Sequence, residues 1–372
     1  MKSVLNPAKQ AVLAAGGTGG HMFPAQALAA ELAKRGWSIA LVTDARGLAL
    51  AKDFPADPIA VIDAATISPA NPFKSIVGAM KIAGGYTAAR RIIKDLKPSV
   101  VIGFGGYPAF PTLMAARGKA KIVLHEQNAV LGRVNRAFAA RAHAIASGFK
   151  RLERMPQRAT GRWVITGNPV RAHITEARDT PYVTPEGDAP INLVILGGSL
   201  GARILSEIPP RAVARLPEDL RRRLKVVQQT REEWVEDALQ VYREAGVEAV
   251  CQPFFTNIGE LLAKAHMVIA RAGASTVTEI AVAGRPSILV PLAIAMDDHQ
   301  TLNAEALADV GAADVIPERE FDGEALTKLL ADRLSHPETL ARRADNARAA
   351  GRADAASALA DVVLNVAKGV PV

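Results

Sequence analysis

The sequence alternates between short runs of apolar residues and longer segments whose apolar positions recur with helical spacing. In the first half of the chain, the runs that predict strands occupy residues 11–15, 38–43, 59–62, 100–104, 122–125 and 144–146. In the second half, they occupy residues 191–196, 225–228, 248–251, 268–270 and 287–290. Strands that bury one face would carry more polar residues, so these runs predict parallel sheets covered by helices on both sides. The predicted fold class is α/β, with two Rossmann-like domains.

Two glycine-rich turns follow predicted strands about half a chain apart. The first, residues 16–21, has the sequence GGTGGH, and the second, residues 197–202, has the sequence GGSLGA. Glycine lets the backbone approach a ligand closely, and a helix N-terminus presents unpaired N–H groups to an anion. The pair of turns predicts two nucleotide-binding halves that face one cleft.

A stretch rich in proline and acidic residues, 167–190, predicts the connection between the two halves. We expect one domain over residues 1–170 and a second over residues 171–344. The Ala- and Arg-rich segment 340–367 predicts a helix, and residues 345–372 are expected to pack back on the first domain.

Composition narrows the class of protein. Of the 372 residues, 49% are hydrophobic and 22% are charged, which is typical of a globular protein. The net charge of +8 suits phosphorylated substrates or an anionic membrane better than nucleic acid, because basic residues are dispersed and aromatic residues make up 5%. Cys251 is the single cysteine, which excludes an intrachain disulfide and fits a reducing cytoplasm; we interpret it as a buried small residue. We expect neither a signal peptide nor a transmembrane helix.

The first glycine-rich turn is an incomplete dinucleotide-binding motif, because Met22 occupies the position of its third glycine. Asp44 follows the second strand, where a dehydrogenase places its ribose-binding acid, so a nicotinamide-dependent oxidoreductase is an alternative. His21 lies in the first helical turn. The helix N-terminus disfavours the imidazolium form, so we expect a neutral ring that can accept a proton.

Two further polar segments follow strands of the first half. Residues 103–108, GFGGYP, predict a turn whose N–H groups could bind an anion. Residues 125–128, HEQN, do not form a zinc helix because Ala129 stands four positions after His125, and the seven histidines are scattered. No Asp-x-Asp motif occurs in the sequence, so helix ends and a cation such as Arg171 would have to stabilise a leaving diphosphate.

The second half contains a segment suited to a nucleotide diphosphate, residues 271–279, RAGASTVTE. Its small residues allow a diphosphate to approach, and Ser275 or Thr276 could cap the helix or bind a phosphate. The Glu279 carboxylate could accept hydrogen bonds from both hydroxyls of a ribose. The alternative is that Glu279 forms a capping box with Ser275 or Thr276. Residues 297–300, DDHQ, carry hydrogen-bonding groups that could bind a sugar; the alternative is a solvent-exposed turn.

The segment 72–81 combines an apolar helical stripe with flanking lysines: Phe73, Lys74, Ile76, Val77, Met80 and Lys81. An apolar face rimmed by lysine suits an anionic membrane surface, and a core-facing helix is the alternative.

Together these motifs resemble one bacterial family, the UDP-N-acetylglucosamine:undecaprenyl-diphospho-muramoylpentapeptide N-acetylglucosaminyltransferases, known as the MurG family. The matching segments, in the order of the family, are GGTGGH at 16–21, GFGGY at 103–107, HEQN at 125–128, GNPVR at 167–171, GGSLGAR at 197–203, RAGASTVTE at 271–279 and DDHQ at 297–300. Each motif alone is weak, but the ordered set spans almost the whole chain and is specific.

The resemblance implies a GT-B glycosyltransferase with an interdomain active site. It implies transfer of N-acetylglucosamine from UDP to the 4-hydroxyl of the muramoyl sugar of lipid I, with inversion, to form lipid II. The first domain would bind the acceptor and face the membrane, and the second would bind the donor. The implied partners are UDP-N-acetylglucosamine, undecaprenyl-diphosphate-linked lipid I and an anionic membrane surface, with no nucleic acid, cofactor or metal; association with other cell-wall synthesis or division proteins is left open. The implied location is peripheral, on the cytoplasmic face of the cell membrane.

The resemblance also implies roles for individual residues. His21 is the candidate catalytic base, and Glu126 is a weaker candidate. The acceptor site would include Gly105, Gly106 and Tyr107. The implied donor site comprises Thr18, Gly19, Gly20, Asn128, Arg171, Ser199, Phe254, Phe255, Ala274, Ser275, Thr276, Val277, Thr278, Glu279 and Gln300. The membrane-facing residues would be those of the stripe at 73–81.

The sequence departs from the family pattern at Ala25, Leu200 and Phe255. These departures affect how the donor would pack and leave the candidate catalytic residues unchanged. Two further alternatives stay open at this point. One is a UDP-sugar epimerase, or another transferase, of the same fold. The other is a non-catalytic binding or scaffold protein for cell-wall assembly.

Overall fold

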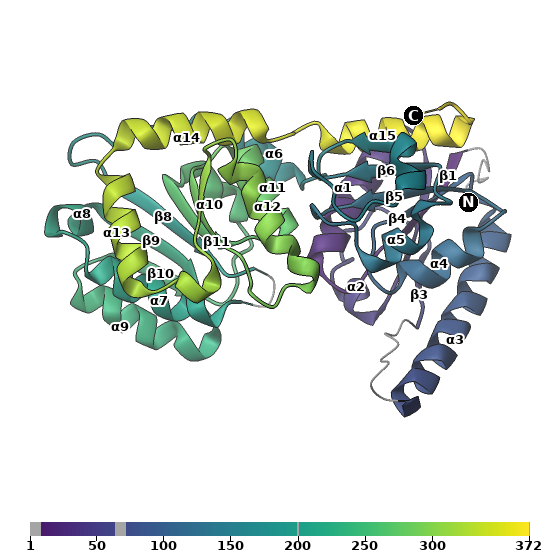
Figure 1. Ribbon diagram of the computed structural model, residues 1–372, viewed down its shortest axis with the longest axis horizontal. Helices are drawn as coiled ribbons and strands as arrows, with labels where there is room; N and C mark the ends of the chain where they lie inside the picture. The colour runs from purple at the N-terminus through teal and green to yellow at the C-terminus, as the bar shows by residue number, and fades with distance from the viewer. Residues whose placement is uncertain (1–8, 64–71, 199–200, 372) are drawn as a thin grey trace. The chain divides into compact units, whose positions relative to one another are not determined.

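The computed structural model describes residues 9–63, 72–198 and 201–371. The chain divides into two compact units. Unit 1 comprises Met1–Arg171 and Asp354–Val372, and unit 2 comprises Ala172–Ala353. In each unit, helices cover both faces of one parallel sheet (Figure 1). This arrangement confirms the predicted α/β class with two Rossmann-like halves.

The sheet of unit 1 has the order β3-β2-β1-β4-β5-β6-β7. Its strands are β1 (Gln10–Ala14), β2 (Ser38–Thr43), β3 (Ile59–Val61), β4 (Val100–Gly103), β5 (Lys121–Glu126), β6 (Ala144–Ser147) and β7 (Trp163–Ile165). Its α-helices are α1 (Gly19–Lys34), α2 (Ala45–Ala49), α3 (Pro72–Leu96), α4 (Ala109–Ala116), α5 (Arg133–Ala139) and α15 (Ala355–Lys368). The crossover between β1 and β4 is the point at which strand order reverses, which is where α/β folds bind ligands.

Alternate residues of the same strand enter two separate cores. On β1, Leu13 packs on the face covered by α1 and α15, whereas Val12 packs on the face covered by α3, α4 and α5. Both side chains are fully buried. Because successive side chains of a strand point to opposite faces, burial on both sides requires the uninterrupted apolar runs seen in the sequence.

Unit 2 repeats the same topology, with the order β10-β9-β8-β11-β12-β13. Its strands are β8 (Ile191–Leu196), β9 (Leu224–Gln229), β10 (Glu248–Gln252), β11 (Met267–Arg271), β12 (Ser287–Val290) and β13 (Ala313–Val315). Its α-helices are α6 (Ala172–Ala177), α7 (Arg203–Ala214), α8 (Glu218–Arg223), α9 (Val235–Glu244), α10 (Ile258–Lys264), α11 (Ala274–Ala283), α12 (His299–Ala308), α13 (Gly323–Leu334) and α14 (Pro337–Ala350).

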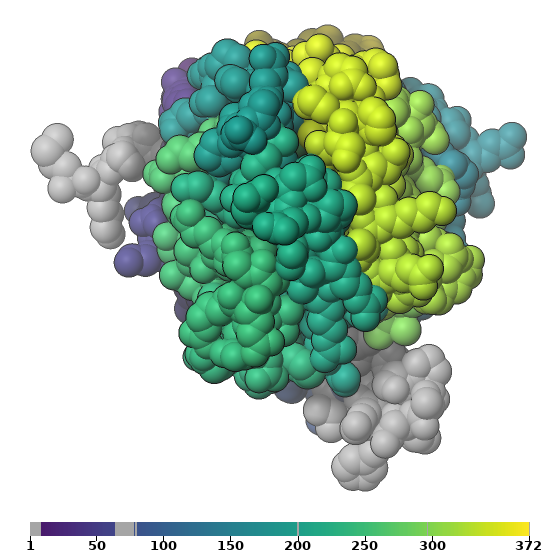
Figure 2. Space-filling model, turned by 90° about the vertical axis from the view of Figure 1, so that its left-hand side faces the viewer, coloured from purple at the N-terminus to yellow at the C-terminus, as the bar shows by residue number. Residues whose placement is uncertain are grey.

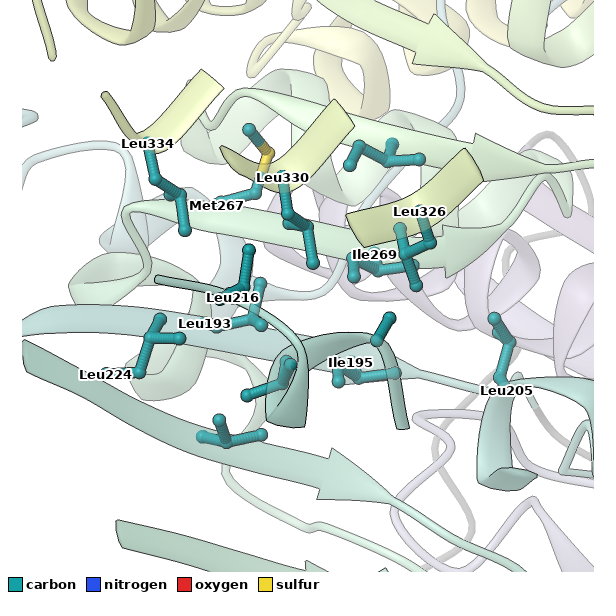
Figure 3. Packing of buried hydrophobic residues seen from close by; sticks show 14 of the residues in the cluster. Leu193, Ile195, Leu205, Leu216, Leu224, Met267, Ile269, Leu326, Leu330 and Leu334 are labelled. Atoms are coloured by element: carbon teal, nitrogen blue, oxygen red, sulfur yellow. The ribbon is translucent and has the colours of Figure 1, made fainter. Parts of the chain in front are cut away.

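One core of unit 2 lies between the sheet and helices α7 and α13. Leu326, Leu330 and Leu334 recur every four residues on α13 and point at Leu193 and Met267 of the sheet (Figure 3). The same core contains Cys251, which is buried as predicted, and burial raises the pKa of its thiol.

The C-terminal segment corrects the sequence prediction, which treated residues 340–367 as one helix. Two helices occupy this region, because α14 ends at Ala350, Gly351 has extended backbone, and α15 begins at Ala355. A Cβ at Gly351 would lie 2.3 Å from the Ala281 carbonyl oxygen, so the chain passes α11 too closely for any other residue. α14 packs on α11 and α13, and its yellow surface adjoins earlier, teal segments of unit 2 in Figure 2.

α15 completes the core of unit 1. Leu359 and Val363 of α15 are fully buried in the same core as Leu28 of α1. Arg35 at the end of α1 donates to the carboxylate of Asp361 and to the Ser357 hydroxyl, the latter at 2.8 Å. A segment distant in sequence therefore covers one face of the first sheet.

The predicted strands are confirmed with small shifts of their ends, and the sequence prediction missed two. Both β7 (Trp163–Ile165) and β13 (Ala313–Val315) are three-residue edge strands, too short to produce a recognisable pattern. None of the helices formed by residues 9–63, 72–198 and 201–371 has the length and apolar character needed to span a membrane.

Candidate functional site

In unit 1, the parallel topology brings three of the predicted segments to one edge of the sheet. The strands β1, β4 and β5 are neighbours, and the turns that contain His21, Gly105 and Gln127 each follow one of their carboxyl ends. Ligands of open α/β sheets bind at this edge.

His21 lies in the first turn of α1 and is half-buried against the turn that follows β4. Gly105 and Gly106 have φ angles of +83° and +72°, and a Cβ on either would lie 3.3 Å from an atom of the His21 ring. Both glycines are therefore required by the left-handed backbone and by the close approach of the imidazole. Consecutive residues of this kind form a turn whose N–H groups can bind an anion, directly beside a titratable ring.

The imidazole of His21 is held by the segment that follows β5. Its Nδ1 lies 3.0 Å from Oε1 of Gln127, and Nε2 of Gln127 lies 2.9 Å from Nδ1 of His125. His125 is fully buried, packs on the ring of Phe104 and reaches the Gly167 carbonyl oxygen through Nε2 at 3.3 Å. Burial lowers the pKa of His125 to about 4, so this imidazole is neutral at pH 7.

Glu126 is buried, and its carboxylate accepts four hydrogen bonds. One oxygen accepts from the backbone and side-chain amides of Asn128, at 3.1 and 3.3 Å. The other accepts from Gly132 N at 2.8 Å and from Nδ2 of Asn135 at 2.9 Å. The carboxylate thus ties the turn after β5 to α5. Asn135 was not identified from the sequence, because it lies within a helix outside any motif.

Asp44 serves the backbone of the first glycine-rich turn. It caps α2 by accepting from Gly47 N at 2.8 Å, and it also accepts from Gly17 N at 2.9 Å. This arrangement accounts for an acid after the second strand without a ribose, which removes the observation that favoured a nicotinamide-dependent enzyme.

Arg171, the predicted diphosphate cation, is the last residue of unit 1. Its guanidinium lies over the ring of Phe23 on α1, 4.2 Å from the centroid. The preceding Asn168 is buried and donates to the Gln127 carbonyl oxygen at 2.8 Å. These contacts place the GNPVR motif beside the first turns of α1 and the HEQN segment.

In unit 2, the N-terminus of α11 has the features of an anion site. Its N-cap is Gly273, which has no side chain to cap the helix, and the first turn contains Ala274, Ser275 and Thr276 but no acid. The Ser275 hydroxyl is buried and has no hydrogen-bond partner among the described residues. Glu279 lies one turn further on and is 8% exposed. The N–H groups and the hydroxyl are thus available to a phosphate.

The loop after β12 is held by three side chains. Arg271 donates to the carbonyl oxygens of Val290 and Pro291 and forms an ion pair with Glu318 at 2.7 Å. Although burial acts to raise the pKa of Glu318, the hydrogen bonds from Arg271 and Ala293 N lower it overall. Oε1 of Gln300 accepts from Leu292 N at 3.0 Å, which fixes the predicted sugar-binding residue against the same loop.

Gln229, at the end of β9, connects two predicted donor loops. Its Oε1 accepts from Gly197 N at 3.0 Å, and its Nε2 donates to the carbonyl oxygens of Gly198 and Pro253, each at 3.1 Å. Gln229 and Glu318 were not identified from the sequence, because neither belongs to a motif. A strand-ending glutamine next to a glycine-rich turn would have been the available signal for Gln229.

The remaining predicted residues can be located as follows. Thr18 is exposed at the N-cap of α1, and Gly19 and Gly20 open that helix. Phe255 is 9% exposed, whereas the adjacent Phe254 is 68% exposed. Val277 and Thr278 are buried on α11. Ser199 and the substituted Leu200 lie outside the described residues. No group of three or more acidic, histidine or cysteine side chains suited to a metal occurs in the part of the chain that the structure describes.

The predicted membrane stripe lies on the first half of α3, which begins at Pro72. Met80 is 63% exposed, and Lys81 beside it is exposed. The side chains of Phe73, Lys74, Ile76 and Val77 are outside the described part of the structure. Further along α3, Arg90, Arg91 and Lys94 are exposed.

Comparison with known proteins identifies the class. Residues 11–147 match the glycosyltransferase family 28 N-terminal domain, and residues 192–359 match the glycosyltransferase family 28 C-terminal domain. With the two parallel-sheet units and their glycine-rich turns, these matches define a two-domain glycosyltransferase.

Three similar proteins define the family within that class. A UDP-N-acetylglucosamine--N-acetylmuramyl-(pentapeptide) pyrophosphoryl-undecaprenol N-acetylglucosamine transferase of Maricaulis maris is 53% identical over 97% of this chain and 98% of its own. An enzyme of the same name from Phenylobacterium zucineum is 49% identical over 97% and 99%. The crystal structure of Acinetobacter baumannii MurG superposes with a TM-score of 0.75 at 31% identity, covering 95% of this chain and 98% of the other. The chain belongs to the MurG family of N-acetylglucosamine transferases.

Proposed function

We propose that this protein transfers N-acetylglucosamine from its UDP donor to the 4-hydroxyl of the muramoyl sugar of lipid I, with inversion at the anomeric carbon. The M. maris and P. zucineum relatives are named for transfer to an N-acetylmuramyl-(pentapeptide) pyrophosphoryl-undecaprenol. The observation that carries the proposal is the contact between the His21 imidazole and the Gly105–Gly106 turn. This contact puts a base next to a turn whose N–H groups can bind an anion. A diphosphate-linked sugar substrate needs both, the base for its hydroxyl and the N–H groups for its diphosphate.

In the proposed reaction, His21 removes the proton of the acceptor 4-hydroxyl as its oxygen bonds to the anomeric carbon of N-acetylglucosamine. The bond from that carbon to the UDP oxygen breaks, and its electron pair leaves with the diphosphate. The N–H groups of Gly105, Gly106 and Tyr107 would bind the acceptor diphosphate. Unit 1 is thereby assigned to the acceptor.

We assign Glu126 a positioning role. Four N–H groups already occupy its two oxygens, and deprotonating a substrate would require breaking at least one of these bonds. His21 is the better candidate base because it is half-exposed at the edge of the sheet.

We assign the donor to unit 2. The first-turn N–H groups of α11 and the Ser275 hydroxyl would bind the diphosphate, and Glu279 would accept from the ribose. Phe255 would contact the uracil, and Gln300 the sugar. The roles of Thr18, Gly19, Gly20, Asn128 and Arg171 toward the donor, implied by the family resemblance, are part of the same proposal.

We further propose that α3 rests on the anionic cytoplasmic face of the cell membrane, where the lipid-linked acceptor is held. Support comes from the exposed Met80 and from the exposed cations Lys81, Arg90, Arg91 and Lys94 on the same helix. Exposed apolar side chains combined with basic residues favour an interfacial helix.

The test is transfer of radiolabelled N-acetylglucosamine from UDP to a lipid I analogue in the presence of EDTA. Labelled lipid product is expected, and its formation would also show that no loosely bound metal is needed. His21→Ala should lower kcat by about 10²- to 10⁴-fold while calorimetric binding of UDP-N-acetylglucosamine is retained. Normal turnover of His21→Ala would exclude His21 as the base.

The same assay separates the alternatives. Conversion of the UDP-sugar in the absence of any lipid acceptor would identify an epimerase. Transfer to a soluble acceptor in preference to the lipid would identify another transferase of the fold. Tight donor binding without turnover on any acceptor would identify a binding protein.

A further inference from the structure

A continuous series of polar contacts runs from the edge of the unit 1 sheet into its interior. It joins Nδ1 of His21 to Oε1 of Gln127, Nε2 of Gln127 to Nδ1 of His125, and Nε2 of His125 to the Gly167 carbonyl oxygen. His125 is fully buried and Gln127 is 2% exposed, so water cannot readily replace either of these two side chains.

The direction of each hydrogen bond follows from the inner end. A carbonyl oxygen can only accept, so Nε2 of His125 must bear the hydrogen that reaches Gly167. Burial keeps this imidazole neutral at pH 7, with its pKa lowered to about 4. A neutral imidazole has one N–H, and Nδ1 of His125 is therefore an acceptor.

The orientation of the Gln127 amide is fixed in turn. Its NH₂ group donates to Nδ1 of His125 at 2.9 Å and to the His125 carbonyl oxygen at 3.2 Å. The opposite orientation would direct the amide oxygen at two acceptors and leave both of them unpaired in a buried site. Oε1 therefore faces His21, and it can only accept.

We propose that Gln127 and His125 are positioning residues that hold His21 as the Nδ1–H tautomer and leave Nε2 of His21 as the proton acceptor. Both ring nitrogens lie against the turn, since a Cβ on Gly106 would lie 3.6 Å from Nε2 and a Cβ on Gly105 would lie 3.6 Å from Nδ1. Because Gln127 occupies Nδ1, Nε2 is the nitrogen left to take a proton. Neutral histidine in water favours the opposite tautomer, with the hydrogen on Nε2. Without this series of contacts, the hydrogen would reside mainly on Nε2, the nitrogen that Gln127 does not contact.

The tautomer assignment stands on the hydrogen-bond geometry, and its catalytic consequence rests on the function proposed above. The first measurement is long-range ¹H–¹⁵N correlation NMR of the full-length protein labelled at histidine, with the His21 signals assigned from the His21→Ala spectrum. We expect a protonated Nδ1 and an unprotonated Nε2 at pH 7.5. A protonated Nε2 on His21 in the wild-type protein would overturn the proposal.

The second measurement uses Gln127→Met, which keeps the length of the side chain and removes its three hydrogen bonds, one to His21 and two to His125. We expect the His21 signals to move toward the Nε2–H tautomer and kcat to fall by about 10- to 1,000-fold, with KM for the donor unchanged. The matched control is Gln26→Met, because Gln26 lies on the same helix as His21 and donates to the Asp53 carbonyl oxygen at an exposed site. It should leave the tautomer and kcat unchanged.

The outcomes distinguish this inference from the proposed function. Unchanged His21 signals in Gln127→Met would overturn the positioning role, even if the enzyme makes lipid product. The expected tautomer in a protein that transfers no sugar to lipid would uphold the role of Gln127 and overturn the reaction. If Gln127→Met does not fold, the wild-type spectrum alone decides the tautomer.

Discussion

His21 and Gly106 are so close that a Cβ on Gly106 would lie 3.3 Å from Cδ2 of the imidazole. The glycine also has a φ angle of +72°, which disfavours any other residue. Two turns from different parts of the sequence thus meet so closely that a methyl group would displace its neighbours by a few tenths of an ångström, the Gly16 carbonyl oxygen at 3.2 Å among them. The position of the ring relative to the turn after β4 depends on that contact.

Gly106→Ala should therefore displace the ring as well as strain the turn. We expect kcat/KM for the lipid acceptor to fall by about 10- to 100-fold and the free energy of unfolding to fall by about 1–2 kcal/mol. The control is Gly118→Ala, since Gly118 has a similar φ of +69° but a Cβ added there would meet no heavy atom within 4 Å. Steady-state kinetics and urea unfolding of both variants measure the difference. Equal losses of activity in the two variants would contradict the role of the contact.

Gln229→Leu should loosen the two loops that the Gln229 amide connects in unit 2. We expect the Kd for UDP-N-acetylglucosamine, measured by calorimetry, to rise by about 10-fold, because the Gly197–Gly198 backbone and Pro253 lose a shared partner. Gln240→Leu, on the exposed face of α9, is the matched substitution and should leave the Kd unchanged. An unaltered Kd in Gln229→Leu would remove the loop after β8 from the donor site.

The buried His125 should make the protein less stable in mild acid. Its pKa is about 4 in the folded protein and 6.5 in its ordinary state, so between these values the unfolded chain binds more protons. The free energy of unfolding therefore has its full value above pH 6.5. It decreases as the pH falls toward 4, by up to about 3 kcal/mol. Urea unfolding from pH 7 to pH 4.5 should reveal this loss. His125→Gln should weaken the pH dependence, and His336→Gln, at an exposed site, should preserve it.

Met80→Ser with Lys81→Ser should reduce binding of the protein to anionic phospholipid vesicles in a sedimentation assay. We expect about a 10-fold loss of the partition coefficient, since one apolar side chain and one cation are removed from the proposed interface. Val183→Ser removes a similarly exposed apolar side chain, 69% exposed, from unit 2 and serves as the control. Transfer to a water-soluble acceptor should be unaffected in both variants. Equal vesicle binding by the double variant and the wild type would exclude this part of α3 from the interface.

Much of the fold was predictable because burial on both faces of a strand leaves a local signature. The run at residues 191–196 predicted β8 at its observed ends, and His21, Gly105 and Ser275 each belong to a motif directly after such a run. The short edge strand β13 (Ala313–Val315) escaped prediction because three residues show no period. The helix break at Gly351 also escaped prediction, because its cause is the close approach of the Ala281 carbonyl oxygen, and Ala281 is distant in the chain.

The sequence by itself thus determined the two α/β halves and the family, and it located the glycine-rich and polar turns at the ends of the strands, because each depends on residues adjacent in the chain. Only the tertiary structure decided which side chains of those turns contact and hydrogen-bond one another. Gln127 stands between His21 and His125 because β1 and β5 end at the same edge of one sheet. A hydrogen bond between side chains as distant in sequence as His21 and Gln127 has no local signature. Its direction follows from which groups the folded sheet buries together.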